Sequence, residues 1–275
     1  MNADLHCHST LSDGLLPPAD LVRLAARNGV TLLSLTDHDE TSGLAAAREA
    51  ASRTGIDFVG GVEISVSWRG HTLHVVGLRI DEANATLSEG LASIRDAREI
   101  RAHRIAEELA RVGIEESLEG ARRQATNPAL ISRTHFARFL VERNRARDVK
   151  SVFQRFLARG KPGYVAHEWI GLEKAVGWIV ASGGVAVVAH PARYGLSVHE
   201  TDQLLMDFRE AGGRAVEVVT ASHTPDQVIR YTHLALKFDL AASRGSDYHG
   251  PGESRVEPGK LAALPPRLKP VWELF

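Results

Sequence analysis

The sequence has a single cysteine in 275 residues, so no disulfide can form within the chain. Such sparse cysteine is typical of proteins kept in a reducing compartment. No stretch approaches the ~18 uninterrupted apolar residues that a membrane span needs, and no basic segment followed by an apolar run suggests a secretory signal. We therefore expect a cytoplasmic protein without a membrane partner. Aromatic residues are also sparse, at 6%, which predicts a mainly aliphatic core.

Net charge is small as well, at -1, and by itself gives no reason to expect a nucleic-acid partner. Its distribution is uneven, because residues 95–161 carry 16 Lys and Arg against 9 Asp and Glu, a net charge of +7. The other residues carry 17 basic and 25 acidic side chains, a net charge of -8. Acidic ligands suit a cation site, and a basic block suits an anionic substrate. Alternatively, many of these arginines simply lie on solvated helix faces.

Two patterns of secondary structure divide the chain. In residues 1–88 and 166–275, short aliphatic runs alternate with amphipathic helical stretches, an order typical of a mainly parallel sheet or barrel. Residues 89–165 have helical periodicity and almost no strand signal. We predict an α/β barrel built from the two outer segments, with the middle segment inserted as a small all-α subdomain that caps the substrate site.

Histidines and acids recur along the expected strands. His6 and His8 lie on or just after the first strand, where alternate side chains share one face. Polar residues follow most of the other strands or lie within them: Asp13, Asp37, His38, Asp39, Glu63, His74, His190, Asp247 and His249. In α/β barrels, the carboxyl ends of the strands meet at one face, where active sites lie. Any one of these histidines could be an ordinary buried or surface residue, but their recurrence predicts a shared metal site.

The donor types narrow the choice of metal. Imidazole and carboxylate ligands without a thiolate suit Mn, Fe or Zn better than a cysteine-rich structural zinc site. Cys7 should face away from His6 and His8 as a small buried packing residue. A carboxylate such as Glu63 can bridge two ions, and paired divalent ions are a recurrent arrangement for phosphoryl transfer.

These residues resemble the PHP family, named for its polymerase and histidinol phosphatase members. The matching segments occur in family order and span nearly the whole chain outside the insert: His6-Cys7-His8-Ser9 through Ser12-Asp13-Gly14, Leu35-Thr36-Asp37-His38-Asp39, Gly61-Val62-Glu63-Ile64-Ser65, His74, Ala189-His190-Pro191 and Ser246-Asp247-Tyr248-His249. The resemblance implies a distorted (β/α)7 barrel, the PHP fold. It also implies a metal-dependent phosphoesterase with three divalent ions, with Mn²⁺ favoured over Fe or Zn.

The resemblance also implies a ligand set for each ion. The first ion would take His6, His8, Glu63 and Asp247; the second Glu63, His74 and His190; and the third Asp13, His38 and His249. No ligand position is missing, which argues against a PHP module that serves only as a scaffold in a nucleic-acid complex. Arg193 would clamp the reacting phosphate, and together with Asp13 and His249 it forms the predicted catalytic set.

Within the family, the length and the helical insert resemble the branch of 3′,5′-nucleoside bisphosphate phosphatases and the 5′→3′ exoribonuclease RNase AM. This branch implies release of the 3′-phosphate to leave a nucleoside 5′-monophosphate, and also digestion of short RNA. The basic insert agrees, because arginine binds phosphate through bidentate hydrogen bonds. The candidate substrate-binding residues are Arg98, Arg101, Arg133, Thr134, His135 and Arg193. No obligate protein partner is evident.

Other activities stay open. A histidinol-phosphate phosphatase would share the metal site but needs an acidic contact for the substrate amine, which a basic insert makes less natural. A non-catalytic PHP module in a nucleic-acid complex is a second alternative. Another barrel hydrolase is a third, because a His-x-His pair begins several such families.

Overall fold

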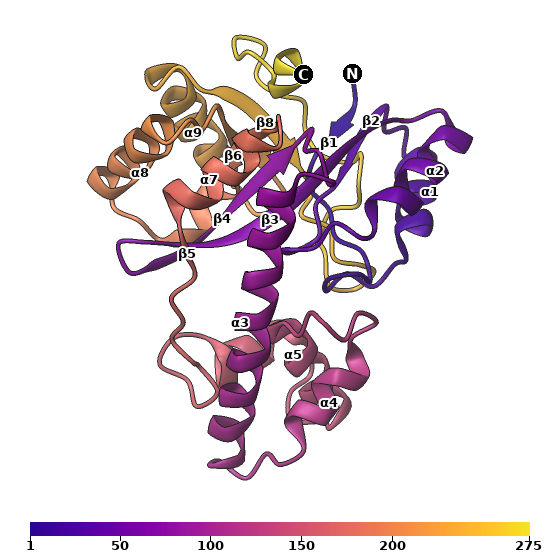
Figure 1. Cartoon of the computed structure of the whole chain (residues 1–275), viewed down its shortest axis with the longest axis vertical. Helices are drawn as coiled ribbons and strands as arrows, with labels where there is room; N and C mark the ends of the chain where they lie inside the picture. Colours follow the sequence, from indigo (N-terminus) through magenta and orange to yellow (C-terminus); the bar gives the residue numbers. More distant parts are fainter.

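A barrel-shaped sheet forms the body of the protein in the computed structural model, which describes residues 1–275 (Figure 1). Its strands are β1 (Ala3–Asp4), β2 (Leu32–Leu35), β3 (Asp57–Trp68), β4 (His71–Leu78), β6 (Val185–Val188), β7 (Ala215–Thr220) and β8 (Ala241–Gly245), paired in that order. The short β5 (Ile170–Gly171) pairs with β3 outside this path. The ends of the sheet meet where the Leu5 N–H donates to the Arg244 carbonyl at 3.0 Å. The sheet is therefore nearly closed, and the predicted barrel fold is confirmed.

One strand departs from the parallel order. β4 runs antiparallel to both β3 and β6, whereas the other consecutive pairs along the barrel are parallel. Arg69 and Gly70, both with positive φ, make the tight turn that reverses the chain between β3 and β4. β3 also continues past Glu63 to Trp68. Glu63 therefore lies within β3 and not after the end of a strand.

Five helices pack around the barrel, and their ends follow local sequence signals. They are α1 (Pro18–Arg27), α2 (Leu44–Thr54), α7 (Leu172–Ala181), α8 (Val198–Glu210) and α9 (Pro225–Lys237). Pro18 occupies the first turn of α1, Ser197 caps α8 and Thr224 caps α9. The 3₁₀ turns η2 (Pro191–Tyr194) and η3 (Val271–Leu274) complete this part. No helix in the protein has both the length and the apolar character of a membrane span.

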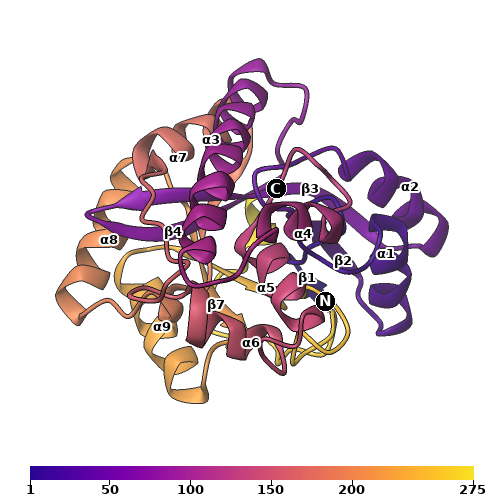
Figure 2. The ribbon, with the colours of Figure 1, turned by 90° about the horizontal axis from the view of Figure 1, so that it is seen from below.

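The insert consists of α3 (Ala85–Ala110), α4 (Ser117–Gln124), α5 (Arg133–Glu142), α6 (Val149–Val152) and the π-helical turn η1 (Phe153–Leu157). Its shorter helices lie below the barrel, at the far end of α3, in Figure 1. Viewed from below, α4, α5 and α6 lie across the barrel face (Figure 2). The first turns of α3 pack into the barrel core through Leu91 and Ile94, and its later turns pack into a separate insert core through Ile105 and Leu109. One continuous helix thus ties the two cores together, and the predicted boundary after residue 88 falls within it.

Candidate metal centre

The site begins at His6 and His8, which are fully buried at the end of β1. The Nε2 atom of His6 lies 3.3 Å from Glu63 Oε1 and 3.6 Å from Asp247 Oδ1. That of His8 lies 3.3 Å from both Glu63 Oε2 and Asp247 Oδ1. Gly245 permits this close approach, because a Cβ atom there would lie only 2.2 Å from the Cβ of His6. Cys7 is buried and its thiol donates to a backbone carbonyl, as expected of a packing residue.

The ligand atoms gather into three overlapping groups. In each group, the candidate atoms all lie within 4.8 Å of one another. The groups are His6, His8, Glu63 and Asp247; His38, Glu63 and His74; and His8, Asp13, His38 and His249. The first is the set expected for the first ion, and the third adds His8 to the expected set. His190 lies outside the second group, although its Nε2 atom is 2.9 Å from Glu63 Oε1.

The donors suit divalent cations. Buried polar atoms normally have hydrogen-bond partners, yet His6 Nε2, His8 Nε2 and Asp13 Oδ1 are buried without one. These atoms converge on the same small volume, together with the carboxylates of Glu63 and Asp247. Oxygen and imidazole nitrogen atoms are donors that divalent metal ions accept. The arrangement is therefore that of a candidate metal centre.

The electrostatics divide the imidazoles of the cluster into two kinds. Burial opposes a charge on His6, His38 and His249, but the neighbouring carboxylates outweigh it and raise the pKa of all three. Burial, reinforced by the neighbouring His249 and His38, lowers the pKa of His8 to about 3. Burial likewise lowers the pKa of His74 to about 4, so both imidazoles are neutral and keep a lone pair for a cation. Burial favours a higher pKa for Glu63, but the surrounding imidazoles, His74 first, hold it well below its usual range.

Two further acids support the ligands without joining the groups. The Asp37 carboxylate accepts hydrogen bonds from the Ser9 N–H at 2.7 Å and from the Ser12 hydroxyl at 2.6 Å. It thereby shapes the loop that leads to Asp13. Asp39 accepts from the Ser65 N–H at 2.8 Å. These bonds fix the chain on both sides of His38.

Sequence reasoning missed Glu217, which is buried in the middle of β7. Its Oε1 atom lies 2.8 Å from His6 Nδ1, and its Oε2 atom accepts from the His190 N–H at 2.5 Å. One carboxylate thus orients two candidate ligands, as outer partners of metal-bound histidines commonly do. The available signal was an acid inside the apolar run Ala215–Thr220, a position at which a charge needs a partner.

Arg98 connects the insert to the ligand loop. Its Nε atom donates to Asp39 Oδ2 at 2.8 Å, its Nη2 atom donates to the Ser65 hydroxyl at 2.8 Å, and its guanidinium lies over the Trp169 ring. The side chain is buried yet also reaches the pocket wall. Two of its N–H groups therefore hold Asp39, and a third holds Ser65.

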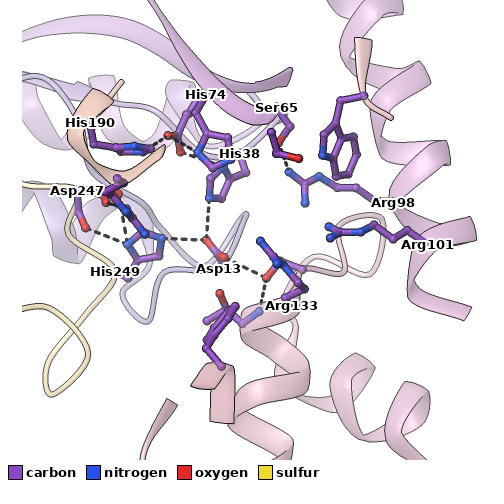
Figure 3. A pocket seen from close by; sticks show the side chains of 17 residues that line it. Asp13, His38, Ser65, His74, Arg98, Arg101, Arg133, His190, Asp247 and His249 are labelled. Atoms are coloured by element: carbon purple, nitrogen blue, oxygen red, sulfur yellow. Dashed lines mark hydrogen bonds and ion pairs between the residues drawn. The ribbon is translucent and has the colours of Figure 1, made fainter. Parts of the chain in front are cut away.

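Arg101 and Arg133 face the ligands from the opposite side of the pocket (Figure 3). Thr134 is also a lining residue of the pocket. Neither guanidinium has a carboxylate within 4 Å. Each reaches a backbone carbonyl at 3.4 Å, that of Val165 or Leu157, and lies over an aromatic ring, that of Trp169 or Phe153. The Nε atom of Arg101 is buried without a partner. Burial, followed by the nearby Arg133 and Arg98, lowers the pKa of Arg101 to about 9. We call Arg101, Arg133 and Thr134 the cationic wall.

The last two candidate substrate-binding residues, His135 and Arg193, lie in different surroundings. His135 is buried and does not line the pocket, because its Nδ1 atom accepts from the Ser132 N–H at 3.1 Å as part of the cap of α5. Arg193 follows β6 on η2 and does line the pocket, with its Nη1 atom donating to Asp247 Oδ2. Asp247 is also the main cause of the raised pKa of Arg193. Arg193 therefore stands at the edge of the metal centre.

The pocket has further lining residues that the sequence did not suggest: Ser65, Thr72, Ser132, Phe153 and Trp169. Its only acids are Asp13, Glu63 and Asp247, all members of the ligand groups. The rest of the pocket is thus uncharged or basic. Such a pocket suits a substrate with more than one anionic group.

Known proteins resemble this chain over nearly its full length. The 3′,5′-nucleoside bisphosphate phosphatase of Chromobacterium violaceum is 48% identical over 271 residues, covering 98% of this chain and 95% of that protein. The 5′-3′ exoribonuclease Rnm of Escherichia coli is 43% identical over 274 residues, covering 99% and 93%.

Solved structures also resemble this chain over nearly its full length. An amidohydrolase structure from Chromobacterium violaceum, with bound sulfate and no metal, has a TM-score of 0.96 at 48% identity and covers 100% of this chain and 95% of its own. A structure from Bifidobacterium adolescentis described as a metal-dependent phosphoesterase has a TM-score of 0.84 at 27% identity, covering 99% and 93%. The family model of the PHP domain matches residues 4–161. The chain belongs to the PHP domain family.

Proposed function

We propose that this protein is a metal-dependent phosphoesterase that hydrolyses the 3′-phosphate of nucleoside 3′,5′-bisphosphates. The products are a nucleoside 5′-monophosphate and phosphate. One observation carries the proposal: a single pocket has a cluster of cation ligands on one side and two guanidinium groups without carboxylate partners on the other. A bisphosphate supplies one anionic group to each side. The 48% identity to a nucleoside bisphosphate phosphatase supports the same substrate.

The proposed cofactor is a set of three divalent ions, with Mn²⁺ favoured over Fe or Zn. Their proposed ligands are His6, His8, Asp13, His38, Glu63, His74, His190, Asp247 and His249. When bound, divalent ions would supply Lewis-acid stabilisation of phosphoryl charge and lower the pKa of water. The buried, partnerless donor atoms and the three ligand groups support this assignment.

The cationic wall would hold the 5′-phosphate, which does not react. Arg101 and Arg133 can each offer two N–H groups to phosphate oxygens. Thr134 lies at the N-terminus of α5, where backbone N–H groups and the helix dipole favour an anion. Arg98 adds positive charge beside them while it holds Asp39. His135 acts in this scheme through the cap of α5, which keeps Thr134 in place.

Arg193 would contact the reacting 3′-phosphate. Its bond to Asp247 keeps the guanidinium at the metal centre, where it can offset the charge that develops on the phosphoryl oxygens. Asp13 and His249 complete the proposed catalytic set through their ligand group, in which Asp13 Oδ1 lies 3.4 Å from His249 Nε2. Fixed donors of this kind require little rearrangement during the reaction.

The proposal is tested by phosphate release from adenosine 3′,5′-bisphosphate with Mn²⁺-loaded protein, with adenosine 3′-monophosphate as the comparison. We expect the bisphosphate to have the higher kcat/KM, because only it occupies the cationic wall, and we expect adenosine 5′-monophosphate as the nucleotide product. The substrate assignment fails if the bisphosphate releases no phosphate while the same preparation hydrolyses another ester.

A second activity, 5′→3′ exonuclease action on short RNA, needs the same geometry with a nucleotide as the leaving group. The 43% identity to the exoribonuclease Rnm supports it. With the 5′-phosphate at the wall, the first phosphodiester would lie at the metal centre. We expect 5′-phosphorylated oligoribonucleotides to lose mononucleotides from the 5′ end, and their 5′-hydroxyl counterparts to react more slowly. Equal rates for the two would argue against anchoring by the wall.

The alternative activities fit less well. Histidinol phosphate carries an amine, but every acid in the pocket belongs to the ligand groups. We therefore expect a lower kcat/KM for histidinol phosphate than for the bisphosphate. A non-catalytic module would bind no transition metal and hydrolyse no ester. A cytoplasmic location and the lack of an obligate protein partner stay predictions.

A further inference from the structure

The N-terminal half of α5, which belongs to the insert, contacts the Asp13 loop of the barrel at two points. The Ser132 hydroxyl, at the cap of α5, donates to Asp13 Oδ2 at 3.0 Å. Two turns later, Arg138 donates through Nη2 to the Asp13 backbone carbonyl at 2.6 Å. All three residues are buried. The insert therefore holds both the carboxylate and the backbone of a candidate metal ligand.

Arg138 also holds the segment that follows His249. Its Nε and Nη2 atoms donate to the two carboxylate oxygens of Glu253, each at 2.8 Å. The next residue, Ser254, accepts from the His249 N–H at 2.7 Å. One face of α5 thus bridges the two barrel loops that carry Asp13 and His249.

The bond from Ser132 determines which oxygen of Asp13 is available. With Oδ2 engaged, Oδ1 is buried without a hydrogen-bond partner, 3.4 Å from His249 Nε2 and 3.8 Å from His38 Nε2. Outside the histidines of its own ligand group, Ser132 is the only side chain that bonds this carboxylate. A freely rotating carboxylate would lose this alignment.

The first ligand group is supported differently. His6 bonds Glu217 of β7, Glu63 lies within β3, and Asp247 bonds Arg193 of η2. All of these supports belong to the barrel, and none comes from α5.

We propose that Ser132 and Arg138 are positioning residues for the group formed by His8, Asp13, His38 and His249. The affinity of this group for a divalent cation depends on α5 of the insert, whereas that of the first group does not. The inference rests on the metal dependence proposed above and assigns the insert a role besides substrate binding.

The experiment is a titration of metal-free full-length protein with Mn²⁺ alone, in competition with a chelator, combined with the bound-metal stoichiometry. In Ser132→Ala and Ser132→Gly, we expect one class of sites to bind about 10-fold more weakly, the scale typical of lost outer hydrogen bonds, while the other classes keep their affinity. Ser132→Thr retains the hydroxyl and should restore binding. Ser132→Gly matters because glycine is accepted at a helix N-cap, so a weakened helix does not explain its effect.

The matched control is Ser117→Ala, another buried serine of the insert, whose hydroxyl has no partner. It should bind Mn²⁺ like the unaltered protein. Unchanged affinity and stoichiometry in both Ser132→Ala and Ser132→Gly, or an equal loss in every class, would overturn the inference. Absence of Mn²⁺ binding by the unaltered protein would instead overturn the proposed metal dependence. Since no substrate is present, a wrong substrate assignment leaves the result intact.

Discussion

The two sides of the pocket differ in how their charges are compensated. On the barrel side, the carboxylates of Glu63 and Asp247 lie 3.3–3.6 Å from the His6 and His8 nitrogens. On the insert side, Arg101 and Arg133 have no carboxylate partner and reach backbone carbonyls and aromatic rings instead. A partly buried charge without an opposite charge beside it is costly.

This difference suits two kinds of ligand: one that stays bound on the barrel side and one that exchanges on the insert side. The barrel side offers converging donors at fixed positions, which suits ions that stay bound through many turnovers. The insert side leaves its cations uncompensated, which suits an anion that arrives and departs with each substrate molecule. If this is correct, substitutions on the barrel side should lower turnover of every substrate. Substitutions in the wall should affect only substrates that carry a second phosphate.

The largest effect is expected from Glu63→Gln. Glu63 is shared by two ligand groups, and bound metals supply several kcal/mol of charge stabilisation, which corresponds to about 10³-fold in rate. We expect a loss of at least this size in kcat/KM for the bisphosphate and the 3′-monophosphate alike, together with reduced bound Mn²⁺. Glu168→Gln, at an exposed residue without an ion pair, is the control. Retained activity on either substrate would contradict a shared metal centre.

The second-largest effect is expected from Arg193→Ala. Loss of a donor to developing charge typically costs about 10²-fold, and we expect this as a fall in kcat for both substrates. Steady-state kinetics on the bisphosphate and the 3′-monophosphate provide the measurement, with Arg193→Lys as the charge-conserving comparison. A rise in KM for the bisphosphate alone would instead assign Arg193 to the cationic wall.

Replacing an arginine of the cationic wall should have a smaller effect, and only on substrates that carry a second phosphate. A hydrogen bond to a charged group contributes about 2 kcal/mol, or roughly 30-fold. We expect either single variant, Arg101→Ala or Arg133→Ala, to raise KM for the bisphosphate by about this factor and to leave kcat/KM for the 3′-monophosphate nearly unchanged. Arg111→Ala serves as the control, because Arg111 is exposed and paired with Glu108. Equal losses on the two substrates would remove the distinction between the two sides.

The smallest effect is expected from Glu217→Gln. The amide can still accept from His6 but places an NH₂ group against the His190 N–H. We expect Mn²⁺ affinity to fall about 10-fold, measured by chelator competition, while the preference for bisphosphate over 3′-monophosphate stays the same. Glu210→Gln, on the exposed end of α8, is the matched control. A changed preference would mean that Glu217 also shapes the wall.

Much of this arrangement could be predicted from the sequence. The alternation of aliphatic runs and helices predicts the barrel. The position of each histidine or acid relative to a strand then predicts that His6, His38 and Asp247, far apart in the chain, approach one another. Parallel strands bring such residues to one face by geometry alone. The basic segment 95–161 likewise indicates a cationic surface before any contact is known.

The remaining features depend on which distant residues pack together. The sequence around Glu217 does not indicate that its carboxylate reaches two histidines, because these contacts require β7 to lie beside β6 and near β1. Nor does the sequence distinguish Arg98, which is bonded to Asp39, from Arg101, which has no such partner and lies three positions later on the same helix.

The contacts of α5 with Asp13 and Glu253 also limit how the insert can change during evolution. Inserts in loops can often be exchanged between related proteins because few contacts cross the junction. Here the helix that carries Thr134 of the cationic wall also contacts the loop of Asp13 and the segment of Glu253, through Ser132 and Arg138. A lineage that replaced this insert to change its substrate would have to acquire matching loops at the same time. Selectivity and the machinery of the reaction are therefore passed on as one unit.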